Sequence, residues 1–260
     1  MILSSSRVTA VDRHGNDHPS LLSHLELPSG TSVVELHTDG TPDLERYEAL
    51  HPRERHLVAR AVASRRSDFG DARWCAHEAL RRWGTEACDI PILRGDSGMP
   101  LFPDGVVGTL SHTEGIRGAL VGDAVTWRSV GLDVEQAVPL PAGVFNAVTS
   151  PSERWALSRL VGDTGRERLL GTVLFSAKET VYKSWFPLAG RFLDFDEAEV
   201  ALDMSRGDVG SAGSAGGAGQ GYVGGSWRAR LLTSPTPVDE IHGSWVVRGG
   251  YVATVCGVRA

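Results

Sequence analysis

The segment from residue 166 to 186 constrains the fold of this chain more than any other. Its apolar residues recur every three or four positions, and on a helix they would form one stripe: Leu170, Val173, Leu174, Ala177, Val181 and Trp185. The segment therefore predicts a helix that covers a core. Glu179 and Lys183 fall on roughly the opposite side, one turn apart. They form either an exposed ion pair, which stabilises a helix by about 0.2–0.5 kcal/mol, or part of a cleft that acts on something charged.

A second short segment, VGLDVEQ at residues 130–136, carries two more carboxylates. Side chains alternate along a strand, so Asp133 and Glu135 would share one face while Leu132 and Val134 share the other. Two adjacent carboxylates repel, and a cation between them explains the pair, although a solvated polar face explains it as well. Hard oxygen ligands favour Mg²⁺ or Mn²⁺. Together with Glu179, these residues predict three carboxylates and the Lys183 ammonium around a metal and a phosphate.

The rest of the chain alternates helix and strand patterns. Residues 43–66 and 68–83 predict two helices, the second ending at Gly84. Residues 106–122 predict a β-hairpin with Ser111 and His112 at its tip. Strands are predicted at 125–135, 227–233 and 250–258, and helices at 150–161 and 166–186. Two successive mixed stretches indicate two α+β halves, residues 1–122 and 123–260, joined near Gly122.

A glycine-rich stretch interrupts the second half between Gly207 and Gly225. Its composition of Gly, Ser and Ala is typical of a surface insertion without packing of its own. It contains a formal G-x-G-x-x-G match at Gly219, Gly221 and Gly224. No predicted strand leads into the match and no predicted helix follows it, so we do not expect a dinucleotide site there.

Composition limits the partners. The chain has 260 residues, with 26 basic and 32 acidic side chains and a formal charge of −6, which argues against broad binding of nucleic acid or anionic membrane. Its three cysteines form no C-x-x-C pair, and no segment has the length of apolar sequence that spans a bilayer. We therefore expect a cytoplasmic protein.

A phosphate substrate of an acidic protein needs individually placed cations. The chain offers Lys178, Lys183, His112 and arginines at 65, 66 and 73. Each also has a simpler interpretation. His112 would be a hairpin histidine bonded to nearby backbone, and the arginines would be the solvated surface of a helix junction.

Taken together, these motifs resemble the 4′-phosphopantetheinyl transferase superfamily, in its bacterial enterobactin-synthetase-component-D-like branch. VGLDVE and the later FSAKETVYKSWFPL resemble the paired family signature G-x-D-x-E and [FW]-[SCT]-x-K-E-x-x-x-K. RRSDFGDAR, PILRGDSGMPLFPDG and the hairpin segment resemble its N-terminal motifs. The resemblance spans roughly residues 60 to 195.

The resemblance implies an activity and a set of site residues. The activity is Mg²⁺-dependent transfer of the phosphopantetheine arm of coenzyme A to a serine of an acyl or peptidyl carrier protein, with release of adenosine 3′,5′-bisphosphate. Two pseudo-symmetric α+β halves would hold coenzyme A in the cleft between them, in a monomer. The implied metal ligands are Asp133, Glu135 and Glu179. The implied coenzyme A contacts are Arg65, Arg73, Arg94, Ser111, His112, Lys178 and Lys183.

A serine nucleophile needs a general base, and the metal carboxylates are the available candidates. Glu135 and Glu179 both qualify, with Glu153 as a more distant alternative. Lys183 would stabilise the charge of the leaving bisphosphate.

Two other functions stay open at this point. One is a catalytically silent, regulatory coenzyme A-binding protein. The other is a Mg²⁺-dependent nuclease, although Glu135 and Glu179 both lack the Glu-x-Lys spacing of that class.

Overall fold

The computed structural model describes residues 5–161, 167–205 and 222–260, and arranges them as two sheets with helices packed on each. The first sheet has the order β1-β2-β6-β5 and the second the order β7-β11-β10-β9-β8. The strands of the first sheet are β1 (Arg7–Asp12), β2 (Ser32–His37), β5 (Val106–Thr113) and β6 (Ile116–Asp123). Those of the second are β7 (Trp127–Gln136), β8 (Ala198–Ser205), β9 (Val223–Leu231), β10 (Glu240–Arg248) and β11 (Tyr251–Arg259). This architecture confirms the predicted α+β class.

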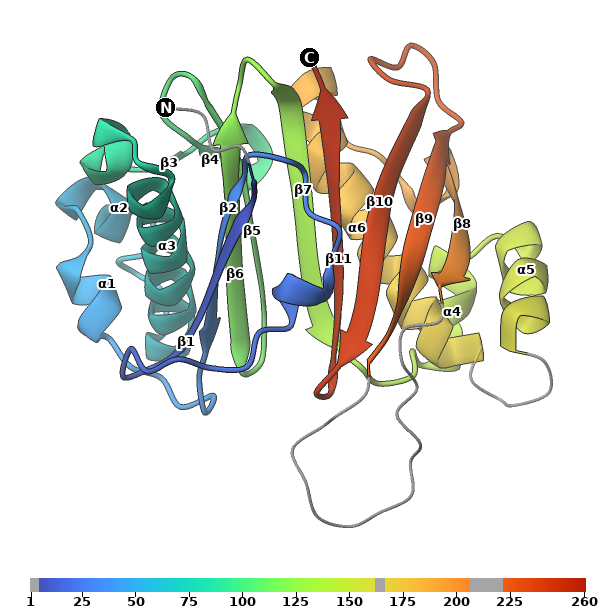
Figure 1. Cartoon of the computed structure of the whole chain (residues 1–260), viewed down its shortest axis with the longest axis horizontal. Helices are drawn as coiled ribbons and strands as arrows, with labels where there is room; N and C mark the ends of the chain where they lie inside the picture. The colour runs from blue at the N-terminus through green and yellow to red at the C-terminus, as the bar shows by residue number, and fades with distance from the viewer. Residues whose placement is uncertain (1–4, 162–166, 206–221) are drawn as a thin grey trace.

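Each sheet is covered by one long helix. Figure 1 shows α3 (Ala63–Trp83) beside the first sheet and α6 (Glu167–Ala189) behind the second. The shorter helices are α1 (Glu45–Ala49), α2 (Pro52–His56), α4 (Ala142–Val148) and α5 (Pro151–Val161). Two short strands, β3 (Leu93–Arg94) and β4 (Pro100–Leu101), pair in the connection that leads from α3 to β5. No helix in the described ranges is long and apolar enough to span a membrane.

The apolar stripe of α6 is buried as the sequence predicts. Val173, Leu174, Ala177, Val181 and Trp185 are each at most 1% exposed, and they pack with Trp227 and Trp245 of the second sheet. On α3, the corresponding buried residues are Cys75, Ala76, Ala79 and Leu80, which pack on the first sheet. Because each helix buries one face, its other side is available for charged groups.

The two sheets also share a core with each other. Leu132 and Val134 of β7 pack with Leu120 of β6 and with Leu22. Leu22 lies in a single 3₁₀ turn, Leu22–His24, between β1 and β2. Since Leu132 and Val134 face this core, the alternation along β7 turns Asp133 and Glu135 toward α6. The predicted division of side chains along this strand is therefore confirmed.

The predicted helix over residues 43–66 is wrong. The structure has two short helices there, α1 and α2, because Pro52 cannot continue a helix and instead begins α2. The ring of His51 accepts a hydrogen bond from the backbone N–H of Arg53 and caps the new helix. The second predicted helix begins at Ala63 instead of Asp68, and it ends at Gly84, whose φ of 90° is left-handed as a helix stop requires.

The predicted hairpin is confirmed, with a small shift of its tip. β5 pairs with β6 from Val106 to Thr113, and Glu114 and Gly115 form the turn. Ser111 and His112 lie inside β5, opposite Gly118 and Arg117, and therefore have fixed positions in the sheet.

Most of the predicted glycine-rich insertion lies outside the described residues, and so do Gly219 and Gly221. Its last residues are an exception, because Val223, Gly224 and Gly225 belong to β9, where they pair with β8 and β10. Gly224 thus opens a strand, whereas a dinucleotide fingerprint requires its glycines to open a helix.

Candidate functional site

Three polar side chains meet where the edge strand of the first sheet approaches the edge strand of the second. The Lys183 Nζ on α6 donates to Asp133 Oδ1 on β7 at 2.7 Å and to Ser111 Oγ on β5 at 3.0 Å. Ser111 Oγ in turn donates to Asp133 Oδ1 at 2.9 Å and accepts from the Val134 backbone N–H at 3.1 Å. We call these three residues the junction cluster. They bring together segments separated by 72 residues of sequence.

Two further carboxylates lie beside the junction cluster. Glu135 follows Asp133 on the same face of β7, and Glu179 lies one turn before Lys183 on α6. Neither carboxylate forms a hydrogen bond or ion pair with another described residue. Burial and the charge of Asp133 raise the pKa of Glu135 to about 7, and the same two causes raise the pKa of Glu179. The two carboxylates are therefore held in a region of negative potential that lacks a sufficient positive charge.

The Asp133 side chain also lacks a full set of positive or hydrogen-bonding partners among the described residues. Its Oδ2 atom is buried and has no hydrogen-bond partner in the described part of the chain. A buried carboxylate oxygen without a partner is costly, and a bound cation would satisfy it. As they stand, no three His, Cys, Asp or Glu side chains of the described residues are arranged to hold a metal ion. The oxygen chemistry of Asp133, Glu135 and Glu179 nevertheless fits Mg²⁺, with Asp133 Oδ2 available to it.

A cavity of about 440 Å³ opens beside the junction cluster, between α3, β5, β7 and the end of α6. Four arginines line it, and we call it the arginine cavity: Arg65 and Arg73 come from α3, Arg94 from β3 and Arg128 from β7. His112 and Lys183 line it as well, so five of the predicted phosphate contacts share one space. Its other walls are largely apolar and include Phe69, Phe102, Tyr182 and Phe186. Cations on an apolar wall suit a ligand with both phosphates and an aromatic base.

Arg73 is the most deeply buried of these cations. The residue is 5% exposed, and its guanidinium lies 4.7 Å above the ring of Phe69. Burial, with the nearby charges of Arg94 and Arg65, lowers the pKa of Arg73 to about 10 against the opposing effect of Glu54. Arg73 stays charged at neutral pH, and it is held inside the wall of the cavity.

His112 reaches the same cavity from β5. Its Nε2 lies 3.5 Å from Arg65 Nη1, and because a guanidinium only donates, Nε2 accepts. Burial and the charges of Arg117, Arg65 and Lys183 lower the pKa of His112. We therefore expect a neutral imidazole that presents one N–H.

Lys178 is placed apart from the other predicted contacts. Its residue is 4% exposed, and Nζ donates to Glu153 Oε2 at 3.0 Å and to the Phe195 carbonyl at 2.7 Å. Glu153 also accepts from the backbone N–H groups of Ser150 and Val200. The Lys178 amine therefore joins α6 to α5 and to the turn that precedes β8, and does not line the arginine cavity. Glu153, the more distant candidate for the general base, forms the ion pair with Lys178.

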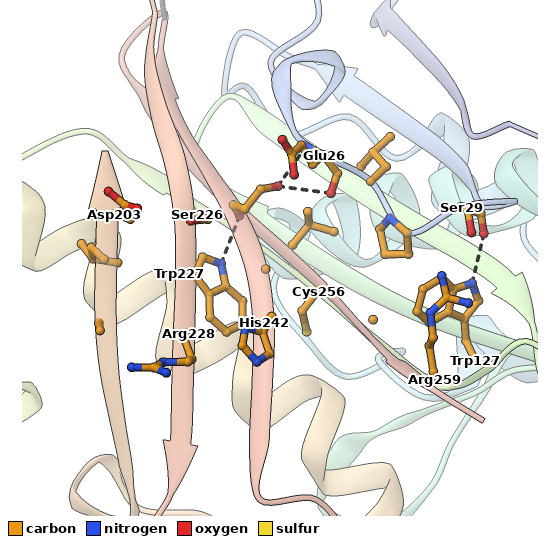
Figure 2. A pocket seen from close by; sticks show the side chains of 18 residues that line it. Glu26, Ser29, Trp127, Asp203, Ser226, Trp227, Arg228, His242, Cys256 and Arg259 are labelled. Atoms are coloured by element: carbon orange, nitrogen blue, oxygen red, sulfur yellow. Dashed lines mark hydrogen bonds between the residues drawn. The ribbon is translucent and has the colours of Figure 1, made fainter. Parts of the chain in front are cut away.

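A second, larger hollow of about 670 Å³ lies on the face of the second sheet that α6 leaves uncovered. Figure 2 shows Arg228 on β9 and His242 on β10, with Glu26 and Ser29 coming from the segment before β2. None of the predicted site residues lines it. Of the described residues, no buried side-chain nitrogen or oxygen in its lining lacks a hydrogen bond. The hollow therefore gives no sign of a missing ligand.

Sequence reasoning missed several residues of the site. Tyr182 and Phe186 flank Lys183 on α6 and line the arginine cavity, a position that their spacing of four could have suggested. Glu54 was also missed, because a charged residue at the start of a helix is ordinarily exposed, yet its side chain is completely buried.

Two family models match the chain, and together they cover both sides of the junction. The description "4′-phosphopantetheinyl transferase N-terminal domain" applies to residues 53–122, and "4′-phosphopantetheinyl transferase superfamily" applies to residues 129–212. The first match contains Arg65, Arg73 and Arg94 of the cavity, and the second contains Asp133, Glu135, Glu179 and Lys183.

Individual relatives agree with the family models over most of the chain. The 4′-phosphopantetheinyl transferase Npt of Nocardia iowensis is 37% identical over 236 residues, which are 88% of this chain and 96% of the relative. The transferase Svp of Streptomyces mobaraensis is 40% identical over 243 residues, which are 90% and 88% of the two chains. PptT of Mycobacterium tuberculosis is 39% identical over 204 residues, 78% of this chain and 83% of the relative.

Proposed function

The chain belongs to the 4′-phosphopantetheinyl transferase superfamily, and we infer that it transfers the 4′-phosphopantetheine arm of coenzyme A to a serine of an apo carrier protein. The other product is adenosine 3′,5′-bisphosphate. One structural observation supports this activity independently of the family assignment. The junction cluster places a lysine and a partly unsatisfied carboxylate directly beside a cavity with four arginines.

Three of the four cavity arginines are proposed to anchor the nucleotide. Arg65, Arg73 and Arg94 all belong to residues 1–122, whereas the carboxylates belong to residues 123–260. We therefore propose that residues 1–122 anchor the nucleotide and that residues 123–260 carry out the chemistry. His112 and Lys183 line the cavity, and we propose that they bind phosphates of coenzyme A. Ser111 would hold Lys183 and Asp133 in place through its hydrogen bonds to both.

Asp133, Glu135 and Glu179 are proposed to hold Mg²⁺, or Mn²⁺ in its place. The support is the buried Asp133 Oδ2, which has no hydrogen bond within residues 5–161, 167–205 and 222–260, together with the raised pKa values of the two glutamates. When bound, Mg²⁺ would neutralise charge on the coenzyme A pyrophosphate.

The protein side chains supply the remaining chemistry. Glu135 or Glu179 takes the proton of the carrier serine, directly or through a water, because both lie near the junction cluster and neither is paired with another described residue. The serine oxygen bonds to the phosphorus that carries the pantetheine arm, and the bond from that phosphorus to the bridging pyrophosphate oxygen breaks. Lys183 stabilises the charge that forms on the leaving bisphosphate.

The partner is an acyl or peptidyl carrier protein that docks beside the cleft, and we expect the enzyme to act as a monomer. All three cysteines are free thiols, as is usual in a reducing compartment, so we propose the cytoplasm.

The deciding experiment is intact mass spectrometry of several apo carrier proteins after incubation with the enzyme, coenzyme A and Mg²⁺. We expect each substrate carrier to gain the mass of one phosphopantetheine arm. A chelator and the Glu179→Ala variant should each abolish the gain, and Glu240→Ala serves as a matched control because Glu240 is an exposed carboxylate on β10.

Two outcomes would contradict the proposal. Transfer that is undiminished in Glu179→Ala would exclude the assigned metal site. No transfer to any carrier, with coenzyme A still bound, would favour a catalytically silent coenzyme A-binding protein.

A further inference from the structure

The guanidinium of Arg73 is buried without a full set of partners. Its Nε atom is buried and has no hydrogen bond to any described residue, although the side chain lines the arginine cavity. A guanidinium has five N–H donors, and leaving them unsatisfied inside a protein is costly. The other donors of this side chain also form no hydrogen bond with a described residue, and they are available to an anionic group that enters the cavity.

The nearest carboxylate, Glu54 of α2, does not satisfy them. Its side chain is 0% exposed, and the closest approach of its Oε1 to Arg73 Nε is 3.8 Å. Glu54 instead accepts from His77 Nε2 with both oxygens, at 2.9 and 3.1 Å, and from the backbone N–H of Ile92 at 3.1 Å. Glu54 thus balances the charge of Arg73 at a distance while its hydrogen bonds go elsewhere.

The contacts of His77 fix its protonation state. Its Nδ1 lies 2.7 Å from the Cys88 carbonyl, and its Nε2 faces the Glu54 carboxylate. Both neighbours are acceptors, and a neutral imidazole has only one N–H to donate. Both hydrogen bonds therefore require the doubly protonated, positively charged ring.

We propose that His77 and Glu54 are positioning residues for coenzyme A binding: the His77 imidazolium holds and neutralises Glu54, which leaves the Arg73 guanidinium free for a phosphate of the substrate. This inference rests on the proposed function, in which Arg73 binds coenzyme A. Neither His77 nor Glu54 lines the arginine cavity, so both act through Arg73.

The physical basis is competition for one buried carboxylate. If His77 loses its charge, the nearest remaining cation to Glu54 is Arg73, only 3.8 Å away. A direct bidentate pair between these two would then replace the present arrangement and occupy donors that the substrate needs. Coenzyme A binding should weaken, while the carboxylates around Asp133 keep their positions.

The experiment is a double-mutant cycle measured by calorimetry with coenzyme A, in parallel with steady-state transfer to a carrier. The variants are His77→Gln, Arg73→Ala and their combination, with His77→Arg as a rescue that retains a cation. We expect His77→Gln to raise the Kd and the KM for coenzyme A about threefold to tenfold with kcat within about twofold of wild type. Arg73→Ala should raise Kd further, and adding His77→Gln to it should change nothing more. His77→Arg should bind better than His77→Gln.

A matched control is His56→Gln, since His56 is an exposed histidine of α2 outside this network. Unchanged Kd in His77→Gln, or an equal effect of His77→Gln with and without Arg73, would overturn the inference. Thermal unfolding of every variant separates lost folding from lost binding. Because Kd is measured without a carrier, the inference is tested even if transfer fails, and failure of wild-type transfer alone would count only against the proposed function.

Discussion

At the scale of single residues, burial decides what each charged group does. Lys178 and Lys183 are five positions apart on one helix, yet Lys178 binds α5 and the turn before β8 while Lys183 belongs to the junction cluster. The resemblance assigns both to coenzyme A. The contacts of Lys178 support a second role, in which it stabilises the packing around α6.

Replacing Lys178 distinguishes these roles. Lys178→Met would leave the Glu153 carboxylate, 1% exposed, without its cation. We expect a loss of about 3–5 kcal/mol in the free energy of unfolding, measured with urea, because an uncompensated buried charge is costly. The double variant Lys178→Met, Glu153→Gln should recover part of that loss. A stable Lys178→Met enzyme with a greatly raised KM for coenzyme A would instead support the substrate contact.

The charge of His77 predicts a pH dependence of stability. Burial alone would lower the pKa of His77, but the hydrogen bond and charge of Glu54 outweigh it and raise the pKa above 6.5, with Arg73 opposing. Folding therefore favours the protonated ring. Its stabilisation is complete below about pH 6.5 and is lost as the pH rises through the higher folded value.

This contribution can be measured as a difference between two proteins. We expect the gap in free energy of unfolding between wild type and His77→Gln to be largest near pH 6 and to shrink toward pH 9. A gap that grows with pH would show that His77 is neutral in the folded protein.

At the scale of secondary structure elements, close packing overrides local propensity. α1 crosses α3 at Gly70, where an added Cβ would lie 2.6 Å from the Tyr47 backbone nitrogen. A glycine inside a long helix is unfavourable by itself, so its presence here reflects the neighbour that it admits. The close approach also helps to fix α3, which carries Arg65 and Arg73.

A pair of glycine variants tests this point. Gly70→Ala gains about 1 kcal/mol of helix propensity but forces a contact with backbone, so we expect a net loss of about 1–2 kcal/mol in the free energy of unfolding. Gly143→Ala in α4 is the matched control, because nothing lies within 4 Å of its added Cβ, and it should stabilise by about 0.5 kcal/mol. Stabilisation by both variants would contradict the packing argument.

At the scale of the whole molecule, the two halves share one core between their sheets. Leu132 and Val134 of the second sheet pack with Ile116 and Leu120 of the first. The site depends on the same junction, since Ser111 and Asp133 come from different sheets. Neither half is therefore expected to be stable alone.

We predict a single cooperative unfolding transition. Tryptophan fluorescence and far-UV circular dichroism should give coincident urea curves, because opening either half exposes the shared core. Leu132→Ala should shift both curves equally, with a loss of about 2–5 kcal/mol. Two separate transitions would show that residues 1–122 and 123–260 are independent domains.

The sequence by itself determined the elements whose pattern is regular. The stripe of α6, the alternation of β7 and the apolar strands of the β5–β6 hairpin each specify an element and the face that it buries. β8 was missed although Val200 and Leu202 alternate with Glu199 and Asp203 along it, and β10 was missed because Gly243 interrupts its apolar positions. The family motifs also depend only on sequence, and the family assignment that followed from them is confirmed.

Only the tertiary structure decided which charged groups meet. Glu54 and His77 are 23 residues apart and show no pattern that links them, and the burial of Glu54 follows from α2 packing near α3. Likewise, the local sequence does not show which of Lys178 and Lys183 contacts the substrate. Successive helix positions turn by about 100°, so the two amines face different neighbours. Lys178 meets α5 and the turn before β8, and Lys183 meets β7. Pairing across space depends on packing, and a linear pattern does not encode it.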